Sequence, residues 1–387
     1  MNEKICVTNN DLVNEPNHYN ALTGIRAIAA YMVYLYHYNL YPIFTNSILL
    51  QDFIQELHIG VSIFFVLSGF LITYRYYNKV DLTKYFFKKY FVNRIARIYP
   101  VYFLLTTLTF IYILRYPDYG VAPELPLISK YLFNLIFVRG FLFKIIYSGI
   151  GQGWSLTVEE CFYIVAPMVI FLMQKQKYME KRVAIVLIFI LVIFLTGVIL
   201  KEVIPSGRYG FLANYDLFIS YTFFGRVFEF GVGILLGALL RQKNKILTNT
   251  QINITYTSCF LIIIILCVLV KIRIFYGIAP AIDHFFGKIV NNIFLPFPIA
   301  GLIWGLINEK TLLLRLLSTR IAVILGKSSY IFYLIHAGIL YQEIIMRINP
   351  NSIMNYIYVF IIINIFSIII YFMFEEPMNR LIRKYNS

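Results

Sequence analysis

Long runs of apolar residues dominate the chain and predict membrane-spanning helices. A helix needs about 20 residues to cross a hydrocarbon core of ~30 Å. Runs of that order recur ten times, separated by short polar stretches, at 20–42, 59–77, 99–115, 154–173, 183–203, 221–240, 251–270, 289–307, 321–345 and 354–374. The pattern therefore predicts an all-α polytopic membrane protein with about ten transmembrane helices.

One further apolar stretch, 129–147, is broken by glycine and carries Arg139 and Lys144. It fits an interfacial or re-entrant segment better than an eleventh span, although a span is the alternative. The composition agrees with a membrane protein, because 60% of the residues are hydrophobic, 14% are charged and the mean hydropathy is +0.73. Soluble globular domains lie far from these values.

The cationic residues predict the orientation, since Lys and Arg are retained on the cytoplasmic side. The segment between the second and third runs has one acid, Asp81, against seven cations: Arg75, Lys79, Lys84, Lys88, Lys89, Arg94 and Arg97. With that loop inside, ten spans place both termini in the cytoplasm. We expect a short cytoplasmic segment at 1–19, a transmembrane domain at 20–374 and a basic cytoplasmic tail at 375–387.

The net charge of +15 does not indicate a nucleic-acid partner. The cations lie in short loops beside membrane spans, where anionic lipids are the ordinary partner. The polar start has no cationic n-region with a cleavage site, so we expect no removable signal peptide before the first span. Four cysteines and three histidines lack the spacing of a metal site, so we expect no metal and no tightly bound cofactor; they are Cys6, Cys161, Cys259, Cys267, His18, His58 and His284.

The first span contains two ionisable residues, Arg26 and His37, within GIRAIAAYMVYLYHYN. Eleven residues at ~100° each make three helical turns with about 20° of drift, so the two side chains share one face about 16 Å apart. Arg26 could snorkel to headgroups and His37 could bond a neighbouring helix. Ionisable groups inside a membrane more often face a cavity or pathway, and a histidine there is a natural general base.

Six motifs in order along the chain resemble the membrane acyltransferase-3 family. They are ALTGIRAIAAYMVYLYH from Ala21, GVSIFFVLSGFLIT from Gly60, KKYFVNRIARIYPVYFL from Lys88, GQGWSLTVEECFYIVAP from Gly151, LGKSSYIFYLIH from Leu325 and FEEPMNRLIRK from Phe374. The resemblance implies an integral enzyme of the bacterial inner membrane. Such an enzyme would move an acyl group, commonly acetyl from acetyl-CoA, to a carbohydrate or lipid-linked glycan such as O-antigen, capsule or exopolysaccharide. The expected type is the stand-alone one, without a C-terminal esterase-like domain.

The resemblance also suggests roles for single residues. His37, Arg26 and Glu159 would be catalytic. For acyl-CoA binding, Arg94 and Arg97 offer forked donors to phosphates, and Ser68 and Gly69 are small enough for a pantetheine arm to pass; the alternatives are charge anchoring and helix packing. Residues expected to bind substrate are Trp154, Ser155, Tyr163, Tyr330 and His336, the last placed in the middle of a span.

Three alternatives remain open from the sequence. A buried Glu159 needs a partner, for which His37 and Arg226 are candidates, or it caps its helix. His37 could deprotonate the acceptor hydroxyl or carry the acyl group itself. The chain could instead be an exporter of a polysaccharide or its lipid-linked precursor. An exporter, however, has no evident need for the Arg26 and His37 pair or for the cytoplasmic arginines.

Overall fold

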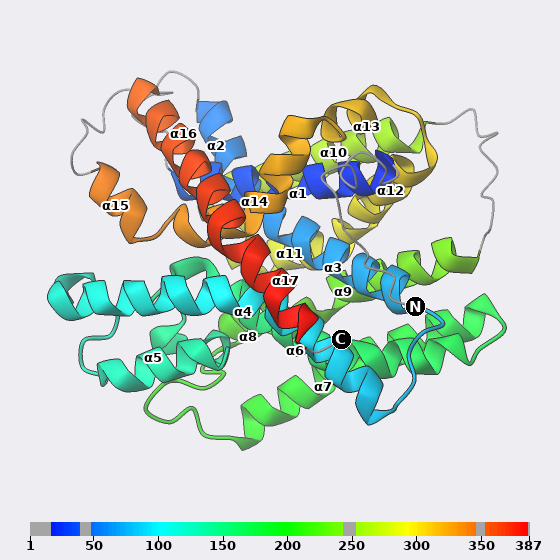
Figure 1. The fold of residues 1–387 in the computed structure, drawn as a ribbon, viewed down its shortest axis with the longest axis horizontal. Helices are drawn as coiled ribbons and strands as arrows, with labels where there is room; N and C mark the ends of the chain where they lie inside the picture. Colours follow the sequence, from blue (N-terminus) through cyan, green and yellow to red (C-terminus); the bar gives the residue numbers. More distant parts are fainter. Residues whose placement is uncertain (1–16, 39–47, 243–252, 346–352, 386–387) are drawn as a thin grey trace, which may run out of the picture.

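The computed structural model describes residues 17–38, 48–242, 253–345 and 353–385 (Figure 1). The predicted segment 1–19, apart from its last residues, and Cys6 lie outside these ranges. The longer helices are α1 (Asn17–His37), α3 (Gly60–Tyr76), α4 (Lys84–Arg115), α6 (Trp154–Gln174), α7 (Met179–Val203), α9 (Phe223–Gln242), α10 (Ile254–Tyr276), α12 (Pro296–Asn308), α14 (Arg320–Ile335) and α16 (Ile353–Ile370).

Shorter helices and turns connect them. They are α2 (Ile48–Gln55), α5 (Leu127–Leu135), α8 (Tyr215–Tyr221), α11 (Phe285–Ile289), α13 (Leu312–Leu317), α15 (Ile339–Ile345) and α17 (Glu376–Lys384), with 3-10 turns such as η2 (Leu57–Ile59) and η7 (Ala281–Asp283). In the described residues the β structure is limited to one isolated bridge, between Leu142 and Phe211. The predicted fold class, an all-α polytopic membrane protein, is confirmed.

Eight helical stretches of the described chain are long and apolar enough to cross a membrane: 49–76, 84–115, 151–174, 179–203, 215–241, 254–276, 285–308 and 354–384. They coincide with eight of the ten predicted spans. The other two predicted spans correspond to α1 and α14. The second of these is shorter than predicted, because α14 has 16 residues and ends at Ile335.

Burial separates the centre of the bundle from its perimeter. In the stretches that contain α3 and α9, 72% of the most apolar window is buried inside the protein. In α7 the same measure is 11%, at a mean hydropathy of 3.4. A helix that is apolar all round yet uncovered by protein faces lipid tails. Helices α3 and α9 therefore form the centre, and α7 forms part of the lipid-facing perimeter (Figure 1).

Glycines allow α3 and α9 to pack backbone against backbone. A Cβ atom at Gly69 would lie 2.4 Å from the Phe230 carbonyl oxygen, and one at Gly233 would lie 2.1 Å from that of Val66. Both distances are too short for any side chain. Small residues at such contacts are the usual means of close association between membrane helices. Gly237, four residues after Gly233, lies against the Phe70 carbonyl oxygen in the same way, so Gly69, Gly233 and Gly237 all serve this contact.

Two predicted loops have a definite structure. The cationic segment 75–97 is helical from Lys84 onward, so Arg94 and Arg97 lie on α4 and not in a loop. The predicted tail 375–387 continues as α17, which crosses α4 (Figure 1).

The ambiguous stretch 129–147 contains most of the nine-residue α5 and short 3-10 turns. Nine helical residues are too few to cross a membrane, so this stretch is not an eleventh helical span.

Candidate functional site

Three cavities follow one another along α1, and we name each by its lining. The basic vestibule is lined by Arg26 and eight other cations. The middle cavity lies between α1, α3, α4, α6 and α14, and the histidine chamber contains His37. Arg26, Arg94 and Arg97 line both the vestibule and the middle cavity. Val61 and Tyr333 line both the middle cavity and the histidine chamber.

The basic vestibule is the largest of the three, at ≈ 650 Å³. Its charged lining comes from α1, α3, α4, α9, α14 and α17, from the turn after α3 and from the π-helical turn η9 (Tyr371–Glu375). Nine cations face two carboxylates, a formal excess of seven positive charges: Arg26, Arg75, Lys79, Arg94, Arg97, Arg241, Lys327, Arg380 and Arg383, with Glu375 and Glu376. Only a multiply anionic ligand matches such a lining.

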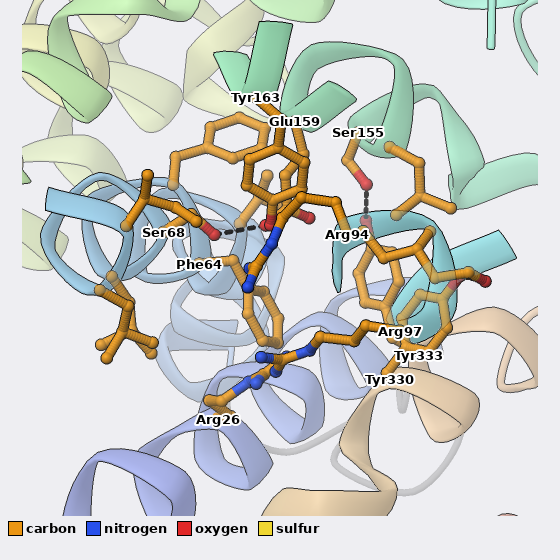
Figure 2. Close-up of a pocket in the computed structure, with 17 residues that line it drawn as sticks. Arg26, Phe64, Ser68, Arg94, Arg97, Ser155, Glu159, Tyr163, Tyr330 and Tyr333 are labelled. Carbon is orange, nitrogen blue, oxygen red and sulfur yellow. Dashed lines mark hydrogen bonds between the residues drawn. The ribbon is translucent and has the colours of Figure 1, made fainter. Parts of the chain in front are cut away.

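Arg94 has unused donors at the inner end of this vestibule. Its side chain is buried, with 5% of the residue exposed, and its guanidinium lies over the Tyr163 ring at 5.6 Å. Its Nε and Nη2 atoms have no hydrogen-bond partner among the described residues. Arg26, Arg94 and Arg97 all point into the middle cavity (Figure 2). Because an unsatisfied buried charged donor is costly, these atoms favour an anionic guest.

Glu159 is the acidic group of the middle cavity. One of its carboxylate oxygens accepts hydrogen bonds from the hydroxyls of both Ser68 and Tyr163 (Figure 2). The predicted partners of Glu159 were His37 and Arg226, and that prediction is wrong. The carboxylate faces the cavity, so the helix-capping alternative is also set aside. Two hydroxyl donors thus hold the carboxyl group in the cavity wall that it shares with the three arginines.

The remaining wall of the middle cavity is apolar, with three hydroxyl groups held in place. Tyr330 donates to the Ile98 carbonyl oxygen at 3.0 Å, and the Tyr333 hydroxyl lies 2.8 Å from Ser155 Oγ. Phe64, Phe65 and several aliphatic residues complete the lining. The volume is only ≈ 70 Å³, about a ninth of the vestibule. The middle cavity therefore has room for a thin, extended chain but not for a nucleotide.

The histidine chamber, of ≈ 90 Å³, is rich in aromatic and polar groups. His37 ends α1 there, and Trp154 begins α6 there. Burial and the neighbouring Tyr221 hydroxyl raise the pKa of Tyr147, so this phenol remains neutral at physiological pH. The lining comprises Val33, Tyr36, His37, His58, Val61, Tyr147, Gln152, Trp154, Ser220, Tyr221, Arg226, Ile282 and Tyr333.

His37 is bonded to a second histidine. Its Nδ1 atom lies 3.0 Å from the Val33 carbonyl oxygen and 3.0 Å from Nε2 of His336. A carbonyl only accepts, so these partners assign the proton of His37 to Nδ1. The Nε2 lone pair of His37 is then free, and that atom has no hydrogen-bond partner among the described residues. A free imidazole nitrogen can act as a base or as a nucleophile.

His336, predicted to bind substrate from the middle of a span, lies at the end of its helix and does not line the chamber. It caps the C-terminus of α14, is fully buried and is absent from the chamber lining. Gln152 Nε2, which donates to the Tyr333 carbonyl oxygen at 2.9 Å, also lies 3.5 Å from Nδ1 of His336. The structure thus places His336 behind His37, in contact with its Nδ1 atom and outside the cavity lining. The sequence missed this because α14 ends ten residues earlier than the apolar run suggests.

Two contacts in the chamber wall were not predicted, an ion pair between Arg226 and Glu229 and a hydrogen bond between His58 and Glu56. Arg226 donates to both oxygens of Glu229, at 2.6 and 2.8 Å, and to Ser62 Oγ at 3.2 Å, all buried. His58 Nε2 lies 3.2 Å from Glu56 Oε2, and Glu56 is fully buried. The sequence contained a signal for each: an acid three residues after Arg226 in a span, and an acid two residues before His58 at the start of one.

The sequence-predicted site residues thus divide among the cavities. Arg26, Arg94 and Arg97 line the vestibule and the middle cavity; Ser68, Ser155, Glu159, Tyr163 and Tyr330 line the middle cavity; His37 and Trp154 line the chamber. Gly69 lines none of the three, because it faces the α9 backbone. Arg26 and His37, which the sequence places on one helical face, occupy opposite ends of the series.

Comparisons with known proteins identify relatives of this chain. The family profile described as "Acyltransferase domain" matches residues 19–375. A Haemophilus influenzae protein without an assigned function is 29% identical over 217 residues, half of this chain and 80% of its own. A Bacillus subtilis protein provisionally named a peptidoglycan O-acetyltransferase is 26% identical over 89% of this chain and 51% of its own.

A Staphylococcus aureus protein provisionally named an O-acetyltransferase is 24% identical over 82% of this chain and 50% of its own. The chain thus spans about half the length of these two relatives. No solved structure gives a significant match.

Proposed function

The chain belongs to the acyltransferase family whose profile it matches over residues 19–375, and on that premise we propose that it is a membrane O-acyltransferase. The donor is acyl-CoA, most simply acetyl-CoA, bound in the basic vestibule from the cytoplasm. The acceptor is a hydroxyl of an extracytoplasmic carbohydrate or lipid-linked glycan, bound in the histidine chamber. The membrane is the bacterial inner membrane.

One observation carries the proposal: three cavities that share lining residues follow one another along α1, from a cationic basin to a histidine with a free ring nitrogen. Nine cations in the vestibule suit the phosphates of CoA, since guanidinium groups bind phosphate through paired donors. The middle cavity is narrow enough to hold an extended pantetheine arm and to exclude the nucleotide. The thioester then lies toward His37, with the CoA phosphates still in the vestibule.

The acceptor side rests on the chamber lining. Tyr36, Tyr147, Trp154 and Tyr221 offer aromatic faces with polar edges, a combination that suits sugar rings. O-antigen, capsule, exopolysaccharide and peptidoglycan, the last from the name of the Bacillus subtilis relative, are the acceptor classes to test. The export of a glycan chain is disfavoured, because the ≈ 70 Å³ middle cavity is too small for a chain of sugars to pass.

The proposal is tested with purified protein and acetyl-CoA. The wild-type protein should release CoA and acetylate a carbohydrate acceptor. His37→Ala should abolish both activities, because it removes the free Nε2 atom. A variant that still inserts and accumulates but retains near-normal turnover would refute the assignment of His37. A wild-type protein that never releases CoA would refute the acyl-CoA donor.

A further inference from the structure

The histidine chamber contains two imidazoles, and only one of them has a carboxylate partner. His37 is oriented by the neutral Val33 carbonyl and by His336. His58 is oriented by Glu56, which is buried and also accepts a hydrogen bond from the Ala281 backbone at 3.0 Å. Both histidines line the same cavity. A single transfer reaction that uses one base leaves the second imidazole without a role.

The two partners favour different chemistry. A carboxylate beside an imidazole stabilises the imidazolium that forms when the ring takes a proton. His58 therefore has the environment of a general base. His37 has no carboxylate partner, and its Nδ1 proton is held by Val33 and His336, so its free Nε2 is better suited to nucleophilic attack. Pairs of titratable groups in contrasting environments commonly divide such roles.

The geometry also leaves the required atoms free. His58 donates a hydrogen bond from its Nε2–H group to Glu56, so the lone pair of the ring is on Nδ1. Nδ1 has no hydrogen-bond partner in the part of the chain that the structure describes. The ring centroid of Tyr36 lies 5.0 Å from that of His37 and 5.6 Å from that of His58. One aromatic ring thus lies against both imidazoles, in a chamber lined by all three side chains.

We propose that His37 carries the acyl group and that His58, oriented by Glu56, deprotonates the acceptor hydroxyl. The inference rests on the acyltransferase function proposed above and extends it. In the first step His37 Nε2 attacks the thioester carbon, the C–S bond breaks and CoA leaves as its thiolate. The Nδ1 proton of His37 passes to His336 Nε2, which leaves a neutral acyl-imidazole.

In the second step His58 Nδ1 takes the acceptor proton, and the acceptor oxygen attacks the acyl carbon. The bond from that carbon to His37 Nε2 breaks, and His37 recovers its Nδ1 proton from His336. His58 then releases its proton to solvent, and the CoA thiolate takes one up there. The balance is one acyl group transferred from sulfur to oxygen, with no oxidant or reductant.

Pre-steady-state kinetics of the whole protein in detergent separate the two steps, with radiolabelled acetyl-CoA as donor. Water and an added pyranoside, methyl N-acetylglucosaminide, serve as acceptor probes. His58→Gln retains an amide that can donate to Glu56 but cannot accept a proton. It should keep a CoA burst near one per protein and accumulate label on the protein, while steady-state turnover falls about 100-fold, within the range for loss of a general base.

Glu56→Gln should give a smaller fall in the same step, because its amide oxygen can still accept from Ala281. His284→Asn is the matched control: this histidine lies outside the chamber and caps α11, and asparagine caps helices well. It should behave as wild type. Unchanged turnover in His58→Gln would overturn the proposal, as would an equal fall in burst and turnover. A wild-type protein without any CoA release would instead refute the acyltransferase function.

Discussion

Nδ1 of His37 lies 3.0 Å from Nε2 of His336, across 299 residues of sequence. The contact joins the C-terminal ends of α1 and α14, which pack side by side at the centre of the bundle. It fixes which nitrogen of His37 is protonated and which is free. His336 itself does not line the chamber. Its effect on catalysis therefore has to act through His37.

This relationship predicts the behaviour of His336 variants. His336→Ala should lower kcat by about 10- to 100-fold, the range for loss of a group that orients a reactive histidine, and should leave the KM for acetyl-CoA unchanged. His336→Asn, which retains an acceptor, should restore part of the rate. Steady-state kinetics on purified variants measure both parameters. An effect on KM alone would show that His336 contacts the donor.

Arg94 and Arg97 should act on donor binding alone. Removal of one charge-assisted contact to phosphate costs about 1.5–3 kcal/mol, so Arg94→Gln or Arg97→Gln should raise the KM for acetyl-CoA about tenfold or more, with kcat little changed. The matched control is Lys181→Gln, which removes an exposed cation that does not line the vestibule. If the KM of the arginine variants equals that of wild type, Arg94 and Arg97 do not bind the donor, and their charges serve only to keep this segment on the cytoplasmic side.

The contact between α3 and α9 predicts a stability effect. Gly233→Leu would force a side chain against the Val66 carbonyl oxygen and the Phe70 nitrogen. The two helices would have to separate, and overpacking of this kind costs about 1–3 kcal/mol or more. Thermal unfolding in detergent should show a lower midpoint. Gly277→Ala is not a suitable control because Gly277 has a φ of +65°, but Gly151→Ala is, since a Cβ there meets no atom within 4 Å.

The buried pair Arg226 and Glu229 predicts that the single variant Glu229→Gln is less stable than a double variant that replaces both residues. Glu229→Gln leaves Arg226 with an uncompensated charge in the bundle, and breaking a buried pair in this way costs about 3–5 kcal/mol. Replacement of both, Arg226→Met with Glu229→Gln, should recover much of that loss. Unfolding midpoints of the single and double variants test the coupling. Equal destabilisation by both would contradict it.

Much of this arrangement was predictable from particular residues. Eight of the ten apolar runs coincide with spanning stretches of the described chain. The eleven-residue spacing placed Arg26 and His37 on one face of one helix, and the structure puts them at opposite ends of the series of cavities. The partners of Glu159 were not predictable, because helical periodicity says which face a residue occupies and not which helix packs there. The orienting role of His336 depends on where α14 ends, and helix ends inside a continuous apolar run leave little signal in sequence.

Glu56 and His58 were overlooked for a different reason. The spacing of two residues is uninformative in a regular helix, where such residues face apart, but here the chain makes a 3-10 turn between α2 and α3. Similarly, the cationic stretch before residue 99 has the composition of a loop, yet it forms the first half of the helix that holds Arg94 in the vestibule.

The central claim is that donor and acceptor reach one reaction path from opposite sides of the membrane. After replacement of the native cysteines, Lys79→Cys places a thiol at the vestibule and Asp283→Cys places one on the exposed turn beside the histidine chamber. An impermeant thiol reagent should label position 79 only from the cytoplasmic face and position 283 only from the other face, with acetyl-CoA protecting position 79 alone. Labelling of both positions from one face, or protection from the side of position 283, would contradict transfer across the membrane.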